Sequence, residues 1–159
     1  MPGMSPVAYQ VVYDATNLIP PHLPWLGFGL LIGLLATAGM ADKGQPWQLG
    51  LVFPALWMAG YVAFVATPHW QLGRAVREGR CEMVSGTVRN FVEQPTDVKG
   101  PPPESFDVGD RHFSYDYFLM GQPGYNQIVR FGAPRLAGRQ VRICAVDGAI
   151  ARLEIQSNA

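Results

Sequence analysis

Two long apolar runs dominate the first half of the chain. Residues 23–41 and residues 49–67 each form a run of 19 residues without a charged side chain. At about 1.5 Å of rise per residue, each helix would reach roughly 28 Å, close to the thickness of a bilayer's hydrocarbon core. The alternative is a pair of buried helices in a soluble bundle, but a chain of this size cannot surround two helices that are apolar on every face. The pattern therefore predicts two membrane spans.

The linker between the two runs favours a tight turn in water. It reads DKGQPWQ and holds two charges, a glycine and a proline. Trp25, Trp47 and Trp70 lie near the ends of the runs, where aromatic rings occupy the interface between lipid and water. We therefore expect an antiparallel helical hairpin over residues 23–73.

Small residues recur at helical spacing within both predicted spans. Gly29 and Gly33 form a GxxxG pair, and Ala55 and Ala59 lie four residues apart in the second run. Such stripes let two helices approach closely. They could form a dimer interface, but we expect them to pack against each other inside one hairpin. Neither run contains an ionisable residue, which argues against a transporter or pump acting alone.

Residues 1–22 form a separate N-terminal segment with an amphipathic pattern. Ser5 and Pro6 provide a helix N-cap and a first-turn proline, and the prolines at 20, 21 and 24 would end the helix. The apolar positions fall on one helical face, which predicts a helix lying along the membrane surface; a frayed terminus is the alternative. No Lys or Arg precedes the first apolar run, so we expect no cleaved signal peptide.

The second half changes to short segments of β-forming residues separated by Gly, Pro and Asp. We expect strands over residues 81–92, 105–108, 111–117, 126–131, 140–146 and 149–155. The Asp147-Gly148 pair between two alternating segments predicts a type I′ hairpin turn. About six short strands favour a small OB-like or SH3-like β-barrel over residues 74–159, because closure buries the faces without long free edges.

Charge divides the chain in the same place. The protein carries 12 basic and 12 acidic residues, but only Asp14, Asp42 and Lys43 fall within residues 1–73. Arg74, Arg77 and Arg80 follow the second run, whereas the linker has one lysine. The positive-inside rule then places the C-terminal domain and both termini in the cytoplasm, with the opposite topology as the alternative.

The two cysteines offer a test of that topology. In a cytoplasmic domain Cys81 and Cys144 would be free and mostly buried thiols. In an oxidising compartment they could pair across adjacent strands.

Candidate chemistry is sparse. His22, His69, His112 and the two cysteines show no metal-ligand spacing, and no nucleophile motif or phosphate loop is present, so we expect no metal, no cofactor and no catalytic residue. Residues 74–159 carry 11 basic and 10 acidic groups, which argues against nucleic-acid binding. The aromatic-rich hairpin could form an interaction surface, although alternation of this kind more often marks one buried face. Its candidate residues are Glu104, Phe106, His112, Tyr115 and Tyr117.

Several short stretches in residues 81–156 carry a resemblance. They are GTVRNFVEQ, ESFDVGDRHFSYDYF, GQPGYNQ and LAGRQVRICAVDGAIARLEI. In this order they resemble uncharacterised small bacterial two-span membrane proteins with a C-terminal β domain. The architecture is also similar to that of the NfeD-like membrane proteins, whose OB domains are partners of stomatin-type scaffolds. The long Pro-rich loop and the ESF hairpin depart from the latter group, so the second similarity is architectural.

Three functions fit these observations. The favoured one is a β-barrel module, anchored in the bacterial inner membrane, that serves protein interaction or assembly. Its partners would be the bilayer and another membrane protein or a second copy of the chain. The alternatives are an accessory subunit of a transporter or envelope enzyme, and a membrane-bound enzyme with a site at the barrel mouth.

Overall fold

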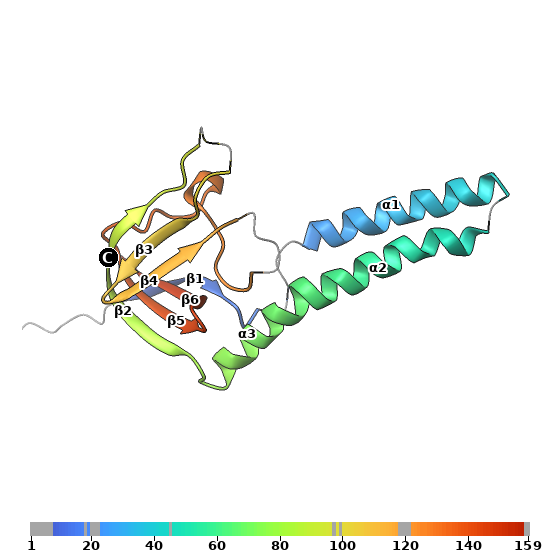
Figure 1. Ribbon diagram of the computed structural model, residues 1–159. Coiled ribbons are helices and arrows are strands. Elements are labelled where there is room, and N and C mark those ends of the chain that lie inside the picture. Colours follow the sequence, from blue (N-terminus) through green and yellow to red (C-terminus); the bar gives the residue numbers. More distant parts are fainter. Residues whose placement is uncertain are drawn as a thin grey trace, which may run out of the picture.

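A helical hairpin projects from a β domain (Figure 1). The computed structural model describes residues 8–17, 19, 23–44, 46–96, 98, 100–117 and 122–157. The hairpin is inserted between the first strand of the sheet and the other five. Both ends of the hairpin therefore return to the same β domain.

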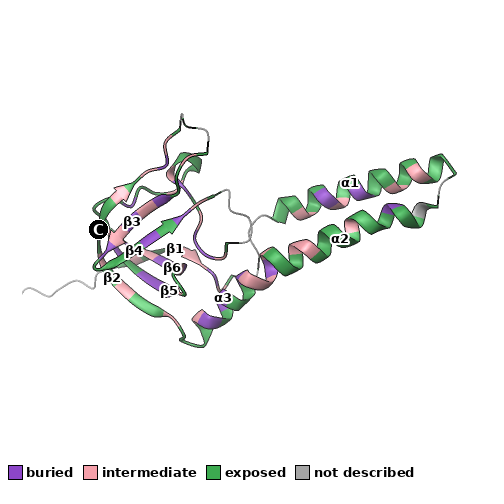
Figure 2. Cartoon of the chain, viewed as in Figure 1, coloured by how far each residue is buried: buried purple, intermediate pink, exposed green. Residues whose placement is uncertain are grey.

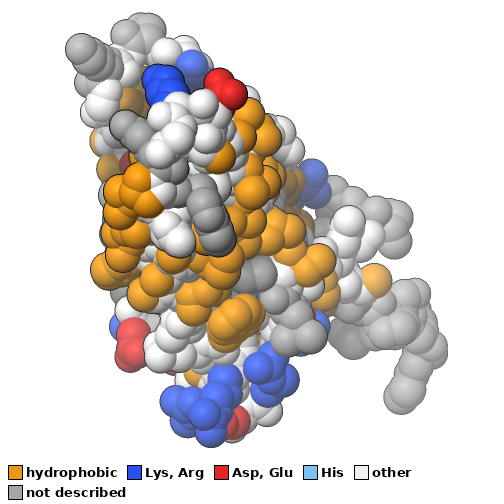
Figure 3. All heavy atoms as spheres, turned by 90° about the vertical axis from the view of Figure 1, so that its right-hand side faces the viewer, with side chains coloured by type: hydrophobic (Ala, Val, Ile, Leu, Met, Phe, Trp, Pro, Cys, Tyr) orange, Lys and Arg blue, Asp and Glu red, His pale blue; other side chains and the backbone are white. Residues whose placement is uncertain are grey.

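The hairpin consists of two helices long and apolar enough to cross a membrane. The first is α1, Leu23–Asp42. The second runs from Gln48 to Arg77 as a chain of helical segments that follow one another directly: η1 (Trp47–Leu51), α2 (Val52–Tyr61), the π-helical η2 (Val62–Ala66) and α3 (Thr67–Arg77). Only 11% of the most apolar window of each helix is buried. Figure 2 shows the hairpin largely exposed, and Figure 3 shows hydrophobic side chains over most of its end face. Apolar helices with so little buried surface are typical of membrane spans.

The second helix is longer than its apolar run, and it enters the β domain. Helix α3 continues to Arg77, and Leu72, Gly73 and Ala75 in it are buried. A Cβ atom on Gly73 would lie 2.3 Å from the carbonyl oxygen of Ala15, so only glycine permits this approach. The final turns are buried on one face, where they pack on the sheet, whereas the preceding segment α2 is largely exposed.

The sheet has six antiparallel strands in the order β1-β6-β5-β2-β3-β4. The first half of the long strand β2 (Glu82–Val92) pairs with β5 (Gln140–Val146), and its second half pairs with β3 (Glu104–Val108). A register irregularity between Arg89 and Val92 includes Asn90 in a left-handed conformation (φ 49°). Two hairpins complete the sheet, β3 with β4 (Arg111–Tyr115) and β5 with β6 (Ala149–Gln156).

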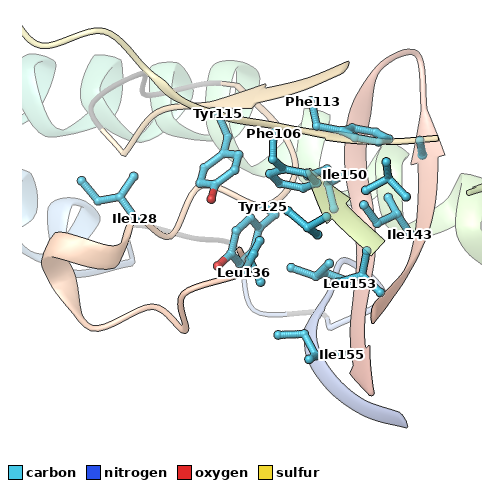
Figure 4. Packing of buried hydrophobic residues seen from close by; sticks show 14 residues of the cluster. Phe106, Phe113, Tyr115, Tyr125, Ile128, Leu136, Ile143, Ile150, Leu153 and Ile155 are labelled. Atoms are coloured by element: carbon cyan, nitrogen blue, oxygen red, sulfur yellow. The ribbon is translucent and has the colours of Figure 1, made fainter. Parts of the chain in front are cut away.

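The sheet is not closed into the barrel that we expected. In the described part of the chain, β1 and β4 are its two edges. Buried side chains nevertheless form a continuous core on the inner face of the sheet, in which the ring of Phe106 lies next to those of Phe113 and Tyr115 (Figure 4). The β5–β6 turn has positive φ at Asp147 (50°) and Gly148 (82°), which confirms the predicted type I′ geometry.

The prediction of an N-terminal surface helix is wrong for the residues that the structure describes. Tyr9–Asp14 is strand β1, which pairs antiparallel with β6 from Tyr9 opposite Gln156 to Asp14 opposite Arg152. Its partner β6 would otherwise expose an unpaired backbone edge, and pairing satisfies those groups. The predicted capping residues Ser5 and Pro6, and the terminating prolines 20 and 21, lie outside the described residues.

The predicted strand over residues 126–131 is also absent. Ile128 is fully buried, and the chain then forms a short 3-10 helix, η3 (Val129–Phe131). The carboxylate of Glu104 accepts a hydrogen bond of 3.0 Å from the backbone N–H of Val129. This side chain gives the backbone a partner that a strand would have found in its neighbour.

Candidate binding cleft and the residues around it

The five predicted interaction residues do not form a surface. Glu104, Phe106 and Tyr115 are buried, with exposed fractions of 0%, 0% and 4%. They belong to the inner face of the β3–β4 hairpin, whose alternation marks the core, as our alternative interpretation held. His112 and Tyr117 are exposed, and the ring of Tyr117 lies 4.5 Å from that of Phe131.

Glu104 is a structural carboxylate in the core. One oxygen accepts the bond from Val129 described above, and the other accepts a hydrogen bond of 3.0 Å from the hydroxyl of Tyr115. The ring of Tyr115 lies 5.0 Å from that of Tyr125, whose buried hydroxyl has no hydrogen-bond partner among the described residues. Burial raises the pKa of both tyrosines, and the nearby Glu104 charge raises it further. Nothing in the local sequence distinguishes Glu104 from a solvent-exposed acid beside a proline run.

A cleft of about 750 Å³ opens beside this cluster. Four parts of the chain form its walls: the N-terminal and middle turns of α3, strand β4, residues 122–126, and the β5–β6 turn. The lining includes Gln71, Leu72, Arg74, Ala75, Arg80, His112, Ser114, Tyr115, Gln122, Tyr125, Asn126, Val146, Asp147 and Ile150. Because α3 directly continues α2 and η2, the cleft opens at the end of the long apolar helix. It is the main candidate site in the described structure. Two of the predicted interaction residues, His112 and Tyr115, lie on its β4 wall, whereas the sequence did not predict the walls formed by α3 and the β5–β6 turn.

The charges at the cleft rim are largely paired. Arg74 and Arg80 each form an ion pair of 2.6 Å with Glu78. These hydrogen bonds lower the pKa of Glu78, with that to Arg74 the largest cause. Asp147 adds one carboxylate on the opposite wall. Two arginines against Glu78 and Asp147 leave the rim with no net formal charge, although the group of Arg74, Glu78 and Arg80 by itself carries one positive charge.

His112 lies at the rim with an acidic neighbour. Its Nδ1 is 2.7 Å from Oδ1 of Asp107, and the other oxygen of Asp107 accepts a hydrogen bond of 2.7 Å from the amide of Asn90. The Asn90 bond, and then the His112 bond, lower the pKa of Asp107. Ser114 is two residues further along the same strand, but no hydrogen bond joins it to His112 in the described structure. The imidazole side chain is 66% exposed, so the arrangement lacks the desolvated base and contacted nucleophile of a hydrolytic triad.

Cys81 and Cys144 form a disulfide, with Cα atoms 5.4 Å apart. Of the two states that the sequence left open, the structure therefore has the paired one. Cys81 directly precedes β2, and Cys144 lies in β5, the strand with which β2 pairs. The pairing of β2 with β5 brings together these two cysteines, which are 63 residues apart in the chain. The bond thus links the residues that follow the second helix to the sheet.

The small residues of the hairpin do not pair as expected. Gly29 and Gly33 are the two buried residues of α1 and face Trp57 and Pro54 of α2. Trp57 also donates a hydrogen bond of 3.1 Å from its indole N–H to the carbonyl oxygen of Trp25. Ala55 and Ala59 are exposed on the other side of α2, because the larger Pro54 and Trp57 side chains fill the glycine groove.

No group of three potential metal ligands occurs among the described residues. His69 is buried with Nε2 2.8 Å from the carbonyl oxygen of Asn17, so it joins α3 to the residue after the β1 turn. His22 lies outside the described residues.

Comparison of the chain with protein-family models, with curated proteins and with solved structures finds no match.

Proposed function

We propose that the chain is a bacterial inner-membrane protein whose helical hairpin holds a β module for protein interaction or assembly at a fixed place above the bilayer. The observation that carries this proposal is the helix that runs from Gln48 to Arg77, from one end of the membrane hairpin into the β domain. A flexible linker would let a tethered domain move freely. This chain has a helix there instead.

The helix is held on the sheet by several independent contacts. The Gly73 backbone lies against the carbonyl of Ala15, and Leu72 packs with Ala151 and the disulfide cysteine Cys144. His69 contacts Asn17, as described above. The module is thus fixed to both ends of the hairpin, since Ala15 and Asn17 precede the first span and α3 follows the second.

The same contacts constrain membrane topology. Pairing of β1 with β6 requires that the segments before the first span and after the second lie on one side of the membrane. The disulfide favours the oxidising side, because thiols in the cytoplasm stay reduced. The hairpin tip then carries its one basic residue, Lys43, into the cytoplasm. We propose this orientation in place of the cytoplasmic β domain that the arginine count predicted.

Two single-cysteine positions test the orientation. The two native cysteines are bonded to each other, so a variant with Lys43→Cys or Ser157→Cys has a single free thiol, at the substituted position. A membrane-impermeant maleimide applied to spheroplasts should label S157C, and it should label K43C only after permeabilisation. The reverse pattern would overturn the orientation, and labelling of both would overturn the two-span hairpin.

Photo-crosslinking in living cells tests the interaction function. A photoreactive residue is placed singly at exposed positions on different faces of the β domain: Gln71, Ser85 and Arg130. The proposal expects a discrete adduct, either with one other protein or with a second copy, from at least one position. The matched control is a photoreactive residue at the lipid-exposed Leu35. Absence of a discrete protein adduct from every β-domain position would refute an interaction function.

An accessory subunit of a larger membrane protein is the second candidate. Ala55, Ala59 and Ala63 form a stripe that the hairpin does not use, since all three are exposed. Helices pack closely over such residues in membranes. Under this candidate, Ala59→Leu should release a polytopic partner that co-purifies in mild detergent, whereas Leu35→Ala should not.

A further inference from the structure

We propose that the cleft binds an extended peptide segment of a partner protein, which adds a strand to the free edge of β4. The occupant is a juxtamembrane segment of another membrane protein, with apolar residues at alternate positions and an acidic residue. This inference deepens the interaction function proposed above and rests on it.

The first argument is the hydrogen bonding of β4. Strand β4 is an edge of the sheet, and it joins β3 through the two-residue turn Gly109-Asp110, with Val108 opposite Arg111. In such a hairpin the residues next to the turn exchange both backbone hydrogen bonds, and every second pair does so after that. The backbone N–H and C=O groups of His112 and Ser114 therefore point away from β3. No hydrogen bond to these groups occurs within the described part of the chain.

The second argument is that this edge faces the cleft. His112 and Ser114 both line it, with α3 and the β5–β6 turn on the other walls. The open donors and acceptors thus belong to residues on the wall of an accessible space, and an unpaired strand edge is a template for pairing with another extended chain. A volume of about 750 Å³ lies in the range of sites that enclose a small ligand or a few residues of extended chain.

The third argument concerns the side chains of the occupant. Leu72 and Ala75 of α3 and Ile150 of β6 give the cleft an apolar lining. In an extended peptide alternate side chains point to opposite faces, so every second residue would meet this lining. Arg74 and Arg80 at the rim are 73% and 61% exposed despite their pairing with Glu78, and an acidic residue of the peptide would share them.

The place of the cleft indicates where the peptide lies in its own protein. The lining includes Pro68 and Gln71, in the first turns of α3 just after the predicted span ends at residue 67. At about 1.5 Å per helical residue, this is within roughly one or two helical turns of the lipid. An extended segment next to a membrane span is confined to that height, whereas a segment of a soluble protein is not.

The test uses the full chain in lipid nanodiscs and a displayed library of random ten-residue peptides. Selected peptides are measured against the full chain and two variants. Ser114→Pro removes one outward N–H, and proline is tolerated at an edge where that group faces solvent. Ser114→Ala keeps the N–H and is the matched control. The proposal expects S114P to weaken binding about tenfold or more, and S114A to change it less than about twofold.

Amide hydrogen exchange provides an independent readout. Peptide binding should slow exchange at His112 and Ser114 and leave the amides of the opposite edge, β1, unchanged. If S114P does not fold, His112→Pro with His112→Ala as its control addresses the other outward N–H. Equal binding by the proline and alanine variants, or protection only outside β4, would overturn strand addition, as would failure to select any peptide.

The failure of this inference can be told apart from failure of the interaction function. Discrete photo-crosslinks from Ser85 or Arg130, with none from Gln71 in the cleft wall, would retain the function and place the partner elsewhere. Loss of adducts from all three positions would remove both.

Discussion

Reduction of the Cys81–Cys144 disulfide should strongly destabilise the β domain. The bond closes a loop between positions 63 residues apart, a loop that contains β2, β3 and β4. In the chain-entropy description, closing a loop of this length stabilises the folded state by about 4 kcal/mol at 25 °C. For a domain of this size, such a loss would lower the melting temperature by roughly 15–30 °C.

The assay must report on the β domain rather than on the hairpin. All four tryptophans lie at positions 25–70, in the hairpin and α3, so their fluorescence is a poor probe of the sheet. Pulse proteolysis of the full chain in urea, read by loss of intact protein after cleavage of the unfolded β domain, measures the required free energy. The wild type is compared with and without a phosphine reductant.

The double variant Cys81→Ala with Cys144→Ala is the control for the reductant. It should unfold near the reduced wild type, with a further small loss from the buried Cys144 site, which is 3% exposed. The reductant should leave the variant unchanged. Equal unfolding free energies for the oxidised and reduced wild type, within about 1 kcal/mol, would show that sheet pairing alone holds these strands and would refute the entropic reasoning.

Three further predictions concern the core and the helix dock. Gly73→Ala should destabilise the domain by about 1–3 kcal/mol in the same assay, because its Cβ would collide with a backbone oxygen, whereas Gly60→Ala, with nothing within 4 Å of the new atom, should not destabilise it. Glu104→Ala should cost about 2–5 kcal/mol because it leaves two donors unpaired, and Tyr115→Phe, which removes one donor, should cost less; equal losses would contradict this account. Burial, and then the charge of Asp14, raise the pKa of Tyr13 to about 12 from 10.0, so the contribution of Tyr13 to stability should be constant below pH 10 and fall as the pH rises from 10 to 12. A Tyr13→Phe variant should lose less stability over that interval, and identical alkaline profiles would contradict the assignment.

Local pattern was sufficient where neighbours along the chain decide the structure. The two apolar helices and the β5–β6 turn at Asp147-Gly148 follow from composition and short-range geometry. The β3–β4 hairpin likewise follows from alternation on either side of a two-residue turn. Each is specified within a single helix or hairpin.

The sequence pattern failed to predict local structure where a segment distant in the chain determines it. Tyr9–Asp14 has apolar positions that suit a helix or a strand, and the free edge of β6, more than a hundred residues away, selects the strand. Residues 126–131 have strand-forming residues but find the Glu104 carboxylate in place of a neighbouring strand. The aromatic residues Phe106, Phe113 and Tyr115 of the β3–β4 hairpin were predicted as a possible surface, but in the folded sheet they face the core.

The sequence by itself determined two helices apolar and long enough to span a membrane and a β domain of ordinary charge, because the polarity of the surroundings acts on each residue separately. Only the tertiary structure decided that the residues on either side of the hairpin share one sheet, that two distant cysteines are bonded, and that the β4 edge borders a cleft lined by α3. Those features depend on which segments contact each other. The free energy that stabilises these contacts comes from strand pairing and burial between residues that are far apart in the sequence, so no local pattern specifies them.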